Sequence, residues 1–395
     1  MVALSRRKLD FTLIMAVAAI ASALAFGMTL QDSAAVALRS VTSSSNLLNV
    51  AVVALVGLLK ALMVEAGMLG AIVQSLNVLV RDRRAVVAIL PAFVGLLPSA
   101  GGAVMSCPMV NEAAQGMGLS AEQKATANYW YRHVIEHVVP VYPAFILASQ
   151  ISDTPIRLMM LYTLPAAVVH VVTMAVLLFG KVPREEMMRP AAPAPVRRRA
   201  LRTLMLNTGP IALSVALVIV FEWHISIASL LAIGLMLPFT FPGWGKMRRI
   251  AAESFLSRPV LMVAGIMLFK DVLVASGAVQ QITQFLSDTG APPLAMAVVL
   301  PFAVSAVAGM TSASVGVTFP MLAGIFAASQ SGHALAAAAY VSAVAGLMVA
   351  PTHLCLVLTA DYFKADIGRM IRTIAVPDAM VLASGIVPYL ISRVL

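Results

Sequence analysis

Residues 50–94 read VAVVALVGLLKALMVEAGMLGAIVQSLNVLVRDRRAVVAILPAFV, and residues 260–304 read VLMVAGIMLFKDVLVASGAVQQITQFLSDTGAPPLAMAVVLPFAV. The two stretches align without a gap and are identical at 14 of 45 positions, including Lys60/Lys270, Gly67/Gly277, Gln74/Gln284 and Pro91/Pro301. A chain rich in Ala, Val and Leu matches itself by composition at roughly a tenth of positions, so the excess indicates a duplication. In a membrane protein such a repeat is typical of transporters.

Composition places most of the chain in a membrane. Hydrophobic residues make up 61% of the 395 residues and charged residues 11%. Apolar runs near twenty residues recur, which is long enough to cross a hydrocarbon core of about 30 Å. A soluble chain of this length could not bury so much apolar surface. The net charge of +10 lies in connecting segments, so it favours membrane orientation and not binding to nucleic acid.

The apolar runs predict an all-α polytopic membrane protein with about nine transmembrane helices. Two further stretches, about 86–116 and about 293–328, are too long and too broken by Pro, Gly, Ser and Thr for one helix each. We therefore expect each to form a re-entrant hairpin of two half-helices, buried in protein or lining a cavity. The expected spans are 11–29, 46–66, 127–149, 157–180, 204–222, 225–242, 258–276, 334–358 and 371–393.

The distribution of Lys and Arg predicts how these spans are oriented. With the N-terminus in the cytoplasm, 21 of the 27 Lys and Arg residues lie on the inner side, three lie outside and three lie within spans. The two repeats, residues 1–180 and 204–395, are then inverted relative to each other and joined by a basic cytoplasmic linker, residues 181–203. The expected location is the inner (plasma) membrane, in a multi-pass arrangement with the C-terminus outside.

The two hairpins are where we expect substrate and ion contacts. Small residues let two half-helices and a ligand approach closely, and broken turns leave N–H groups and carbonyls free. Helix N-termini attract anions, while carbonyls and hydroxyls can hold a cation. The alternative is that these residues only allow close helix packing. The candidates are Ser99, Gly101 and Gly102 in the first hairpin and Thr311, Ser312 and Ser314 in the second.

A span interrupted by proline follows each hairpin. The interruptions are Pro140-Val141-Tyr142-Pro143 and Pro351-Thr352-His353. Proline removes a backbone donor and exposes carbonyls, so a second layer of ligands, with Thr352 and His353 as candidates, is expected to face each hairpin tip. His353 could bind an anion or relay protons, and a histidine satisfied by a carbonyl is the equal alternative.

Residues 128–137, Asn-Tyr-Trp-Tyr-Arg-His-Val-Ile-Glu-His, form the most polar stretch inside any span. In a helix Arg132 and Glu136 stand at i,i+4 and can pair on one face. His133 and His137 also stand at i,i+4, on the neighbouring face. These four residues are candidates for supplying charge to the site or for coupling transport to an ion. The alternative is that they only stabilise the helix internally. The letters at 133–137 also spell H-x-x-E-H, a zinc-peptidase motif, although no third metal ligand is evident in the intervening spans.

Lys270 and Asp271 form another pair of charged residues inside a span. Neighbours in a helix project about 100° apart, so we expect them not to face one another and Asp271 to find another partner or to titrate. The repeat places Ala61 opposite Asp271, which makes Asp271 a candidate for coupling, with solvation at the interface as the alternative. Cys107 and Cys355 lie in apolar surroundings and are expected to be buried packing residues, not a disulfide.

Several of these motifs together resemble the DUF401 family of integral membrane proteins. They are residues 97–103, Leu-Pro-Ser-Ala-Gly-Gly-Ala; residues 106–110, Ser-Cys-Pro-Met-Val; residues 128–133 with Glu136; and residues 269–272, Phe-Lys-Asp-Val. That family is similar to the ion transporter superfamily, which includes gluconate permeases, citrate and dicarboxylate carriers and arsenite permeases. The resemblance implies inverted repeats whose hairpin tips meet near the midplane, and elevator-like motion. Sodium-coupled carboxylate carriers of that superfamily carry Ser-Asn-Thr in the hairpins, where this chain has Ser99-Ala100-Gly101 and Thr311-Ser312-Ala313.

We therefore expect an ion-coupled secondary transporter, a permease for a small and anionic organic solute that works by alternating access. The alternatives are an ion channel and an intramembrane zinc metallopeptidase that uses residues 133–137. We expect that the protein is not an enzyme and has no catalytic residue, metal site or cofactor. We expect transport to be coupled to Na⁺ or H⁺. Its expected partners are the solute or ion and the lipid bilayer, without nucleic acid, and a homodimer is left open.

Overall fold

The computed structural model describes residues 11–95, 100–180, 182, 188, 190–288 and 290–394. The described residues form helices and no strand, apart from an isolated bridge between Asp82 and Met188. Many large apolar side chains remain exposed on helix surfaces. A helix that is apolar all round needs either a protein core or lipid around it, so this exposure agrees with a membrane environment. The predicted all-α fold is confirmed.

The first half of the chain contains nine α-helices and one short 3₁₀ helix within the described residues. The 3₁₀ helix interrupts the polar span, as described below. The elements are α2 (Phe11–Ala25), α3 (Leu30–Thr42), α4 (Ser44–Glu65), α5 (Met68–Leu79), α6 (Arg83–Gly95), α7 (Ala100–Ala113), α8 (Ala121–His133), η1 (Val134–His137), α9 (Pro143–Ile151) and α10 (Ile156–Phe179).

The second half repeats this order after one additional helix, α11 (Ala194–Val220). The later helices begin 211 residues apart in the two halves, at Pro143 and Leu354 and at Ile156 and Ile367. The elements are α12 (Ile225–Thr240), α13 (Trp244–Phe255), α14 (Arg258–Ala275), α15 (Ala278–Asp288), α16 (Pro293–Ala308), α17 (Thr311–Ala328), α18 (Gly332–Met348), α19 (Leu354–Phe363) and α20 (Ile367–Ser392).

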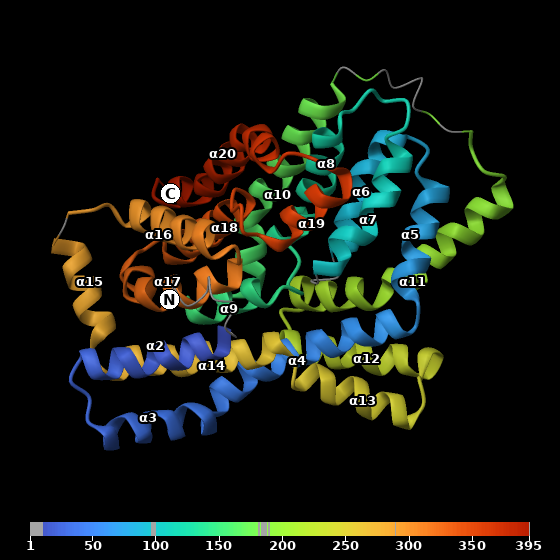
Figure 1. Cartoon of the computed structure of the whole chain (residues 1–395). Coiled ribbons are helices and arrows are strands. Elements are labelled where there is room, and N and C mark those ends of the chain that lie inside the picture. The colour runs from blue at the N-terminus through green and yellow to red at the C-terminus, as the bar shows by residue number, and fades with distance from the viewer. Residues whose placement is uncertain are drawn as a thin grey trace.

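Helix contacts are reciprocal between the two halves. Helix α2 packs against α14 as its counterpart α12 packs against α4, and α3 packs against α14 as α13 packs against α4. Likewise α7 contacts α19 as α17 contacts α9, and α6 contacts α8 as α16 contacts α18. Figure 1 shows α2, α3, α4, α12, α13 and α14 in the lower part of the molecule and α6, α7, α8, α10, α16, α18, α19 and α20 above them. Each part therefore draws helices from both halves.

Five described helices are long and apolar enough to cross a membrane: α4, α10, α11, α17 and α20. Helix α14 is also 18 residues long but carries Arg258, Lys270 and Asp271. The expected spans at 127–149 and 334–358 are each divided into two shorter helices, as their prolines predict. Helix α17, expected as one arm of a hairpin, has 18 residues and is long enough to cross by itself. The structure thus supports several membrane helices without fixing their number at nine.

The segment predicted as a linker, residues 181–203, is partly helical. Helix α11 begins at Ala194, so Arg197, Arg198, Arg199 and Arg202 belong to its first turns. Pro193 and Pro195 do not prevent this, because proline is tolerated at the start of a helix, where its missing N–H would have no partner. Four shorter helices, α3, α5, α13 and α15, were also not predicted, because their apolar residues follow one face and do not form continuous runs.

Candidate functional site

The first helix break lies after α8, in the polar stretch that precedes Pro140. Ser120 caps α8 through a capping box with Gln123, and the α-helix ends at His133. One turn of 3₁₀ helix follows, residues 138–142 are not helical, and α9 begins at Pro143. Pro140 and Pro143 cannot donate the hydrogen bonds that would continue α8, which explains why the span breaks here. The predicted interruption is confirmed.

Side chains from other helices satisfy the carbonyls that this break leaves free. The Tyr340 hydroxyl of α18 donates to the Glu136 carbonyl at 2.9 Å. The Thr163 hydroxyl of α10 donates to the His137 carbonyl. Tyr340 and Thr163 are fully buried. Because a carbonyl without a donor is unfavourable inside a membrane, these contacts stabilise the break within the packed structure.

The break also closes the end of α6, the first arm of hairpin one. Arg132 Nη1 donates to the Val94 carbonyl at 3.2 Å, and the Tyr142 hydroxyl donates to the Gly95 carbonyl. These are among the last carbonyls of α6, which have no partner within the helix. A Cβ on Gly95 would lie 2.3 Å from the Arg132 carbonyl oxygen, so only glycine fits where α6 meets the break.

Glu136 pairs with His133 and not through the expected i,i+4 contact with Arg132. Its Oε1 atom lies 3.0 Å from His133 Nδ1, and both side chains are buried. The prediction assumed a continuous α-helix, whereas residues 134–137 form a 3₁₀ helix, in which i,i+3 side chains are aligned. A carboxylate can only accept, so Nδ1 of His133 carries the proton in this bond.

His137 faces a different partner from His133. Its Nε2 atom lies 3.1 Å from His170 Nδ1, and His170 Nε2 lies 3.1 Å from the Trp130 carbonyl. Trp130 Nε1 donates in turn to the His170 carbonyl at 2.8 Å, so this group ties α8 and η1 to α10. His133 and His137 thus face different partners, which does not match the shared metal that the H-x-x-E-H interpretation requires.

The second break lies between α18 and α19, at residues 349–353, and it contacts the tip of hairpin α16–α17. His353 Nδ1 lies 2.9 Å from the carbonyl of Gly309, the residue that follows α16, and donates to it. Gly309 has φ +69°, and a Cβ there would lie 2.7 Å from Thr352 Oγ1. In this half the break therefore contacts the turn between α16 and α17. The tip of the first hairpin, residues 96–99, lies outside the described residues.

The two breaks meet through an aromatic group. The ring centroids of His133 and His353 are 5.1 Å apart, and that of Tyr129 lies 5.0 Å from the first and 5.8 Å from the second. The Tyr129 hydroxyl donates to the Leu347 and Met348 carbonyls at the end of α18. Residues predicted from separate halves of the chain, His133 and His353, are thus neighbours.

Three buried polar atoms near this meeting point have no hydrogen-bond partner within the described part of the chain: His133 Nε2, His353 Nε2 and Thr311 Oγ1. Thr352 is exposed and His353 is half-buried, so the group borders an accessible surface. Buried polar atoms are satisfied in nearly all native structures, and exceptions point to a ligand, ion or water. These atoms of Thr311 and the two histidines are therefore available to a ligand, an ion or water.

The remaining predicted residues differ in their surroundings. Ser312 is half-buried in the first turn of α17, and the Ser314 hydroxyl donates to the Pro301 carbonyl at 2.7 Å, a bond that joins the arms of the hairpin. Gly101 and Gly102 lie in the first turn of α7. Ser99 lies outside the described residues.

Asp271 belongs to α14, a helix in the lower part of Figure 1. It contacts Lys270 Nζ at 3.4 Å and accepts from Asn46 Nδ2 at 2.6 Å. The expectation that Lys270 and Asp271 would not meet was wrong, because a long lysine side chain can fold back along the helix. The expectation of another partner is confirmed by Asn46.

Sequence reasoning missed three residues of this region. Cys355 lies two residues after His353, and its Sγ and one ring nitrogen from each of His133 and His353 lie within 4.8 Å of one another. Asp378 lies in the middle of α20, is buried, and has no hydrogen-bond partner on Oδ1 in the described structure. Tyr129 belongs to the quoted polar stretch but was assigned no role. Two features of the sequence could have indicated these residues. They are the spacing His353-x-Cys355 and the single carboxylate, Asp378, in an apolar run.

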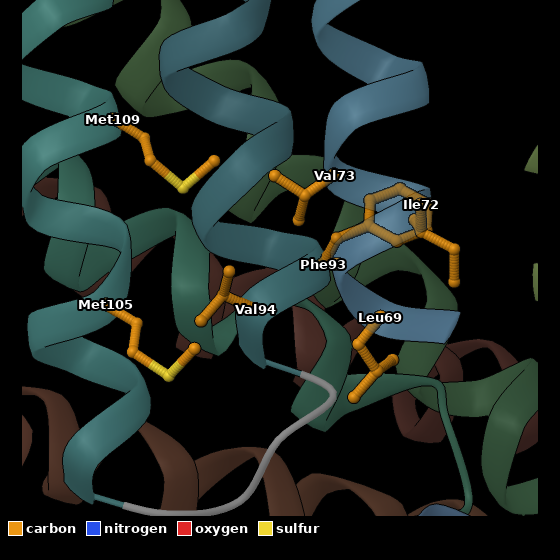
Figure 2. Close-up of a pocket in the computed structure, with 8 residues that line it drawn as sticks. Leu69, Ile72, Val73, Phe93, Val94, Met105 and Met109 are labelled. Carbon is orange, nitrogen blue, oxygen red and sulfur yellow. The ribbon is translucent and has the colours of Figure 1, made fainter. Parts of the chain in front are cut away.

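A separate cavity of about 120 Å³ lies between α5, α6 and α7. Figure 2 shows its lining side chains, with Leu69, Ile72 and Val73 on α5, Phe93 and Val94 on α6, and Met105 and Met109 on α7. Among the residues that the structure describes, those that line the cavity carry no charged or hydrogen-bonding side chain. An anion would lose its hydration there without replacement, so the cavity does not suit the expected solute.

The described structure is that of an all-helical protein with several membrane helices. Polar residues, among them Tyr129, His133 and His353, gather where its two broken spans meet. The chain belongs to the DUF401 family, described as a protein of unknown function, whose family model matches residues 1–392. No curated protein matches the chain. The family resemblance in the sequence motifs is thereby confirmed.

Proposed function

We propose that this protein is a secondary transporter that carries a small organic anion across the inner membrane, driven by an ion gradient. The observation that carries the proposal is the contact between the second break and the tip of hairpin α16–α17. Non-helical backbone inside a membrane protein is tolerated where it is buried or lines a cavity, and broken helices are how many transporters bind their solute.

The proposed anion site lies at the N-termini of α17 and α19. Helix α17 begins at Thr311 and α19 at Leu354, and neither has a side-chain cap on its first N–H groups. The contact of Gly309 with Thr352 brings the two helix starts together. Helix N-termini carry positive partial charge and free N–H donors, which suits a carboxylate. The Thr311 hydroxyl can donate to the solute, and Arg132 adds positive charge at the neighbouring break.

The proposed coupling groups are the buried carboxyl groups of Glu136 and Asp378. Ionisable residues inside a membrane are costly to bury, so they mark ion or proton pathways more often than structural positions. Glu136 lies one turn from the contact between the breaks, and Asp378 is on α20, which packs against α8, α10 and α18. Asp271 is a weaker candidate, because Asn46 and Lys270 already satisfy it.

We further propose that the two halves form an inverted repeat of about nine transmembrane helices and two re-entrant hairpins, with the N-terminus in the cytoplasm and the C-terminus outside. The reciprocal helix contacts support a two-fold relation between the halves. The excess of Lys and Arg on one side supports the inversion. Such a repeat suits alternating access, in which one group of helices moves against the other. Membership of the wider ion transporter superfamily is part of this proposal.

Flux measurements on reconstituted protein test the function. A thermal-shift screen of carboxylates and sugar acids on purified protein first selects candidates, because a ligand selective for the folded state raises its stability. Liposomes with the protein are then loaded to impose a proton or a sodium gradient, and uptake of the selected solute is measured. We expect accumulation under one gradient and none in protein-free liposomes. Absence of uptake for every solute under both gradients would overturn the proposal, and single-channel currents would favour a channel.

A further inference from the structure

The structure assigns to His133, His353 and Cys355 a binding site for a borderline-soft divalent cation such as Zn²⁺. One ring nitrogen of each histidine and the sulfur of Cys355 lie within 4.8 Å of one another. His133 is the last residue of α8, His353 lies in the second break, and Cys355 lies in the first turn of α19. His133 and Cys355 are 222 residues apart in the sequence. Metal binding at these residues does not depend on the proposed transport activity.

The hydrogen bonds of the two histidines leave the correct atoms for a metal. His133 Nδ1 is bonded to the Glu136 carboxylate and His353 Nδ1 to the Gly309 carbonyl, and both partners can only accept. In the neutral rings the proton is therefore on Nδ1, and each Nε2 carries a free lone pair. Both Nε2 atoms are buried without a hydrogen-bond partner in the described structure. A carboxylate or carbonyl on the opposite nitrogen is the usual arrangement of a metal-bound histidine.

Cys355 completes a ligand set with suitable chemistry. It is buried and free of disulfide bonds, in the second position of α19, where the helix dipole favours a thiolate. Imidazole and thiolate together select zinc and related metals over Mg²⁺ and Ca²⁺, which prefer oxygen. Three protein ligands leave one tetrahedral position open, as in zinc sites that also bind water or substrate.

Binding requires a small closure of the site. Nitrogen and sulfur ligands on a tetrahedral Zn²⁺ lie about 3.3–3.6 Å apart, given bonds of about 2.0–2.3 Å. The present spacing, within 4.8 Å, is larger by up to about 1.5 Å. His353 is half-buried in a non-helical segment and can make this adjustment. A bound metal would join the two breaks and stabilise the folded protein.

Metal titration of the purified full-length protein tests the site. After treatment with a chelator, Co²⁺ is added as a spectroscopic substitute for Zn²⁺, and thiolate-to-cobalt absorption is followed, with Zn²⁺ in competition. We expect one metal per chain, and loss of the absorption in Cys355→Ser. The matched control is Cys107→Ser, since Cys107 is also buried and free but bonds to the Ala103 carbonyl. This control should keep the absorption.

Histidine variants separate coordination from misfolding. His353→Gln should weaken metal binding at least tenfold, while His224→Gln, at a position near Ser226 on α12, should leave it unchanged. Melting temperatures without metal show which variants fold, and Zn²⁺ should raise the melting temperature of the wild type but not of folded Cys355→Ser. Failure of the wild type to bind, or equal binding by wild type, Cys355→Ser and His353→Gln, would overturn the assignment.

Discussion

The two helix breaks occupy equivalent places in the two halves of the chain, yet their surroundings differ. At the first break, hydroxyls of Tyr340 and Thr163 satisfy carbonyls, and Arg132 and Tyr142 bind the end of α6. At the second break, one side chain, His353, binds the end of α16, and Thr352 is exposed. The first break is therefore tightly packed and holds buried ionisable groups, whereas the second is more open.

This difference suggests that the two breaks have different roles in the proposed transport. A packed break with a fixed carboxylate suits a coupling ion, whose site must hold its charges in place. An open break beside a hairpin tip suits a solute that enters and leaves. The same topology can serve both roles, because the roles depend on side chains at the break and not on the path of the backbone.

The largest effect is expected from removing the charge at the first break. Glu136→Gln keeps the size of the side chain but loses the charge-assisted bond to His133, which is worth about 1.5–3 kcal/mol. Solute uptake in proteoliposomes should fall by about tenfold to a hundredfold. The control is Glu253→Gln on the exposed face of α13. Full uptake by Glu136→Gln would mean that the first break holds no coupling group.

Substitution of two aspartates tests whether the coupling group lies on α20 or on α14. Asp378→Asn removes a buried carboxyl without a described partner on Oδ1, and Asp271→Asn alters a half-buried one that is already bonded to Asn46. We expect Asp378→Asn to reduce gradient-driven accumulation about tenfold and Asp271→Asn to reduce it less than twofold. Accumulation and gradient-free exchange are measured side by side. The reverse order of effects would place coupling on α14.

A smaller effect, on stability, is expected where α6 meets the first break. A Cβ on Gly95 would lie 2.3 Å from a backbone oxygen, which cannot rotate away. Gly95→Ala should therefore destabilise the fold by about 1–3 kcal/mol. Gly57→Ala on α4 is the control, since a Cβ there meets nothing within 4 Å. Thermal unfolding in detergent measures both, and equal melting temperatures would show that the packing at the first break is loose.

The smallest effect is expected from one hydroxyl. Tyr340→Phe leaves the Glu136 carbonyl without its donor at 2.9 Å, and such bonds in membrane proteins are worth about 0.6–1.7 kcal/mol. Tyr362→Phe, on the exposed surface of α19, should leave the melting temperature unchanged. If the two variants have equal melting temperatures, water or another donor bonds to the Glu136 carbonyl in place of Tyr340. The contrast between the two breaks would then be weaker than proposed.

Much of the helix pattern could be predicted from hydrophobic runs and proline positions. The bounds of α4, α10, α12, α14 and α20 agree with expected spans to within a few residues, because long apolar runs determine membrane helices. Pro140, Pro143 and Pro351 predicted the positions of both breaks, because proline cannot donate the backbone hydrogen bond that continues a helix. The start of α11 was misplaced, since an arginine-rich sequence between prolines gives no hydrophobic signal.

The candidate site was predicted only in part, because the sequence does not show which breaks meet. His133 and His353 were each identified, but their 5.1 Å separation depends on packing of α8 against the end of α18. Cys355 was interpreted as a packing residue, since only the fold brings its sulfur near both rings. The pairing of Glu136 was wrong because a 3₁₀ turn replaced the expected α-helix.

The central claim, that solute binds where the second break meets hairpin α16–α17, is tested most directly by the Thr311 hydroxyl. Thr311→Val keeps the shape of the side chain but removes the buried hydroxyl that has no described partner. Thr173→Val is the control, because the Thr173 hydroxyl bonds to a carbonyl within α10. Solute affinity is measured by uptake at varied solute concentration. The proposal predicts at least a tenfold loss of affinity for Thr311→Val alone, and equal affinity in both variants would contradict it.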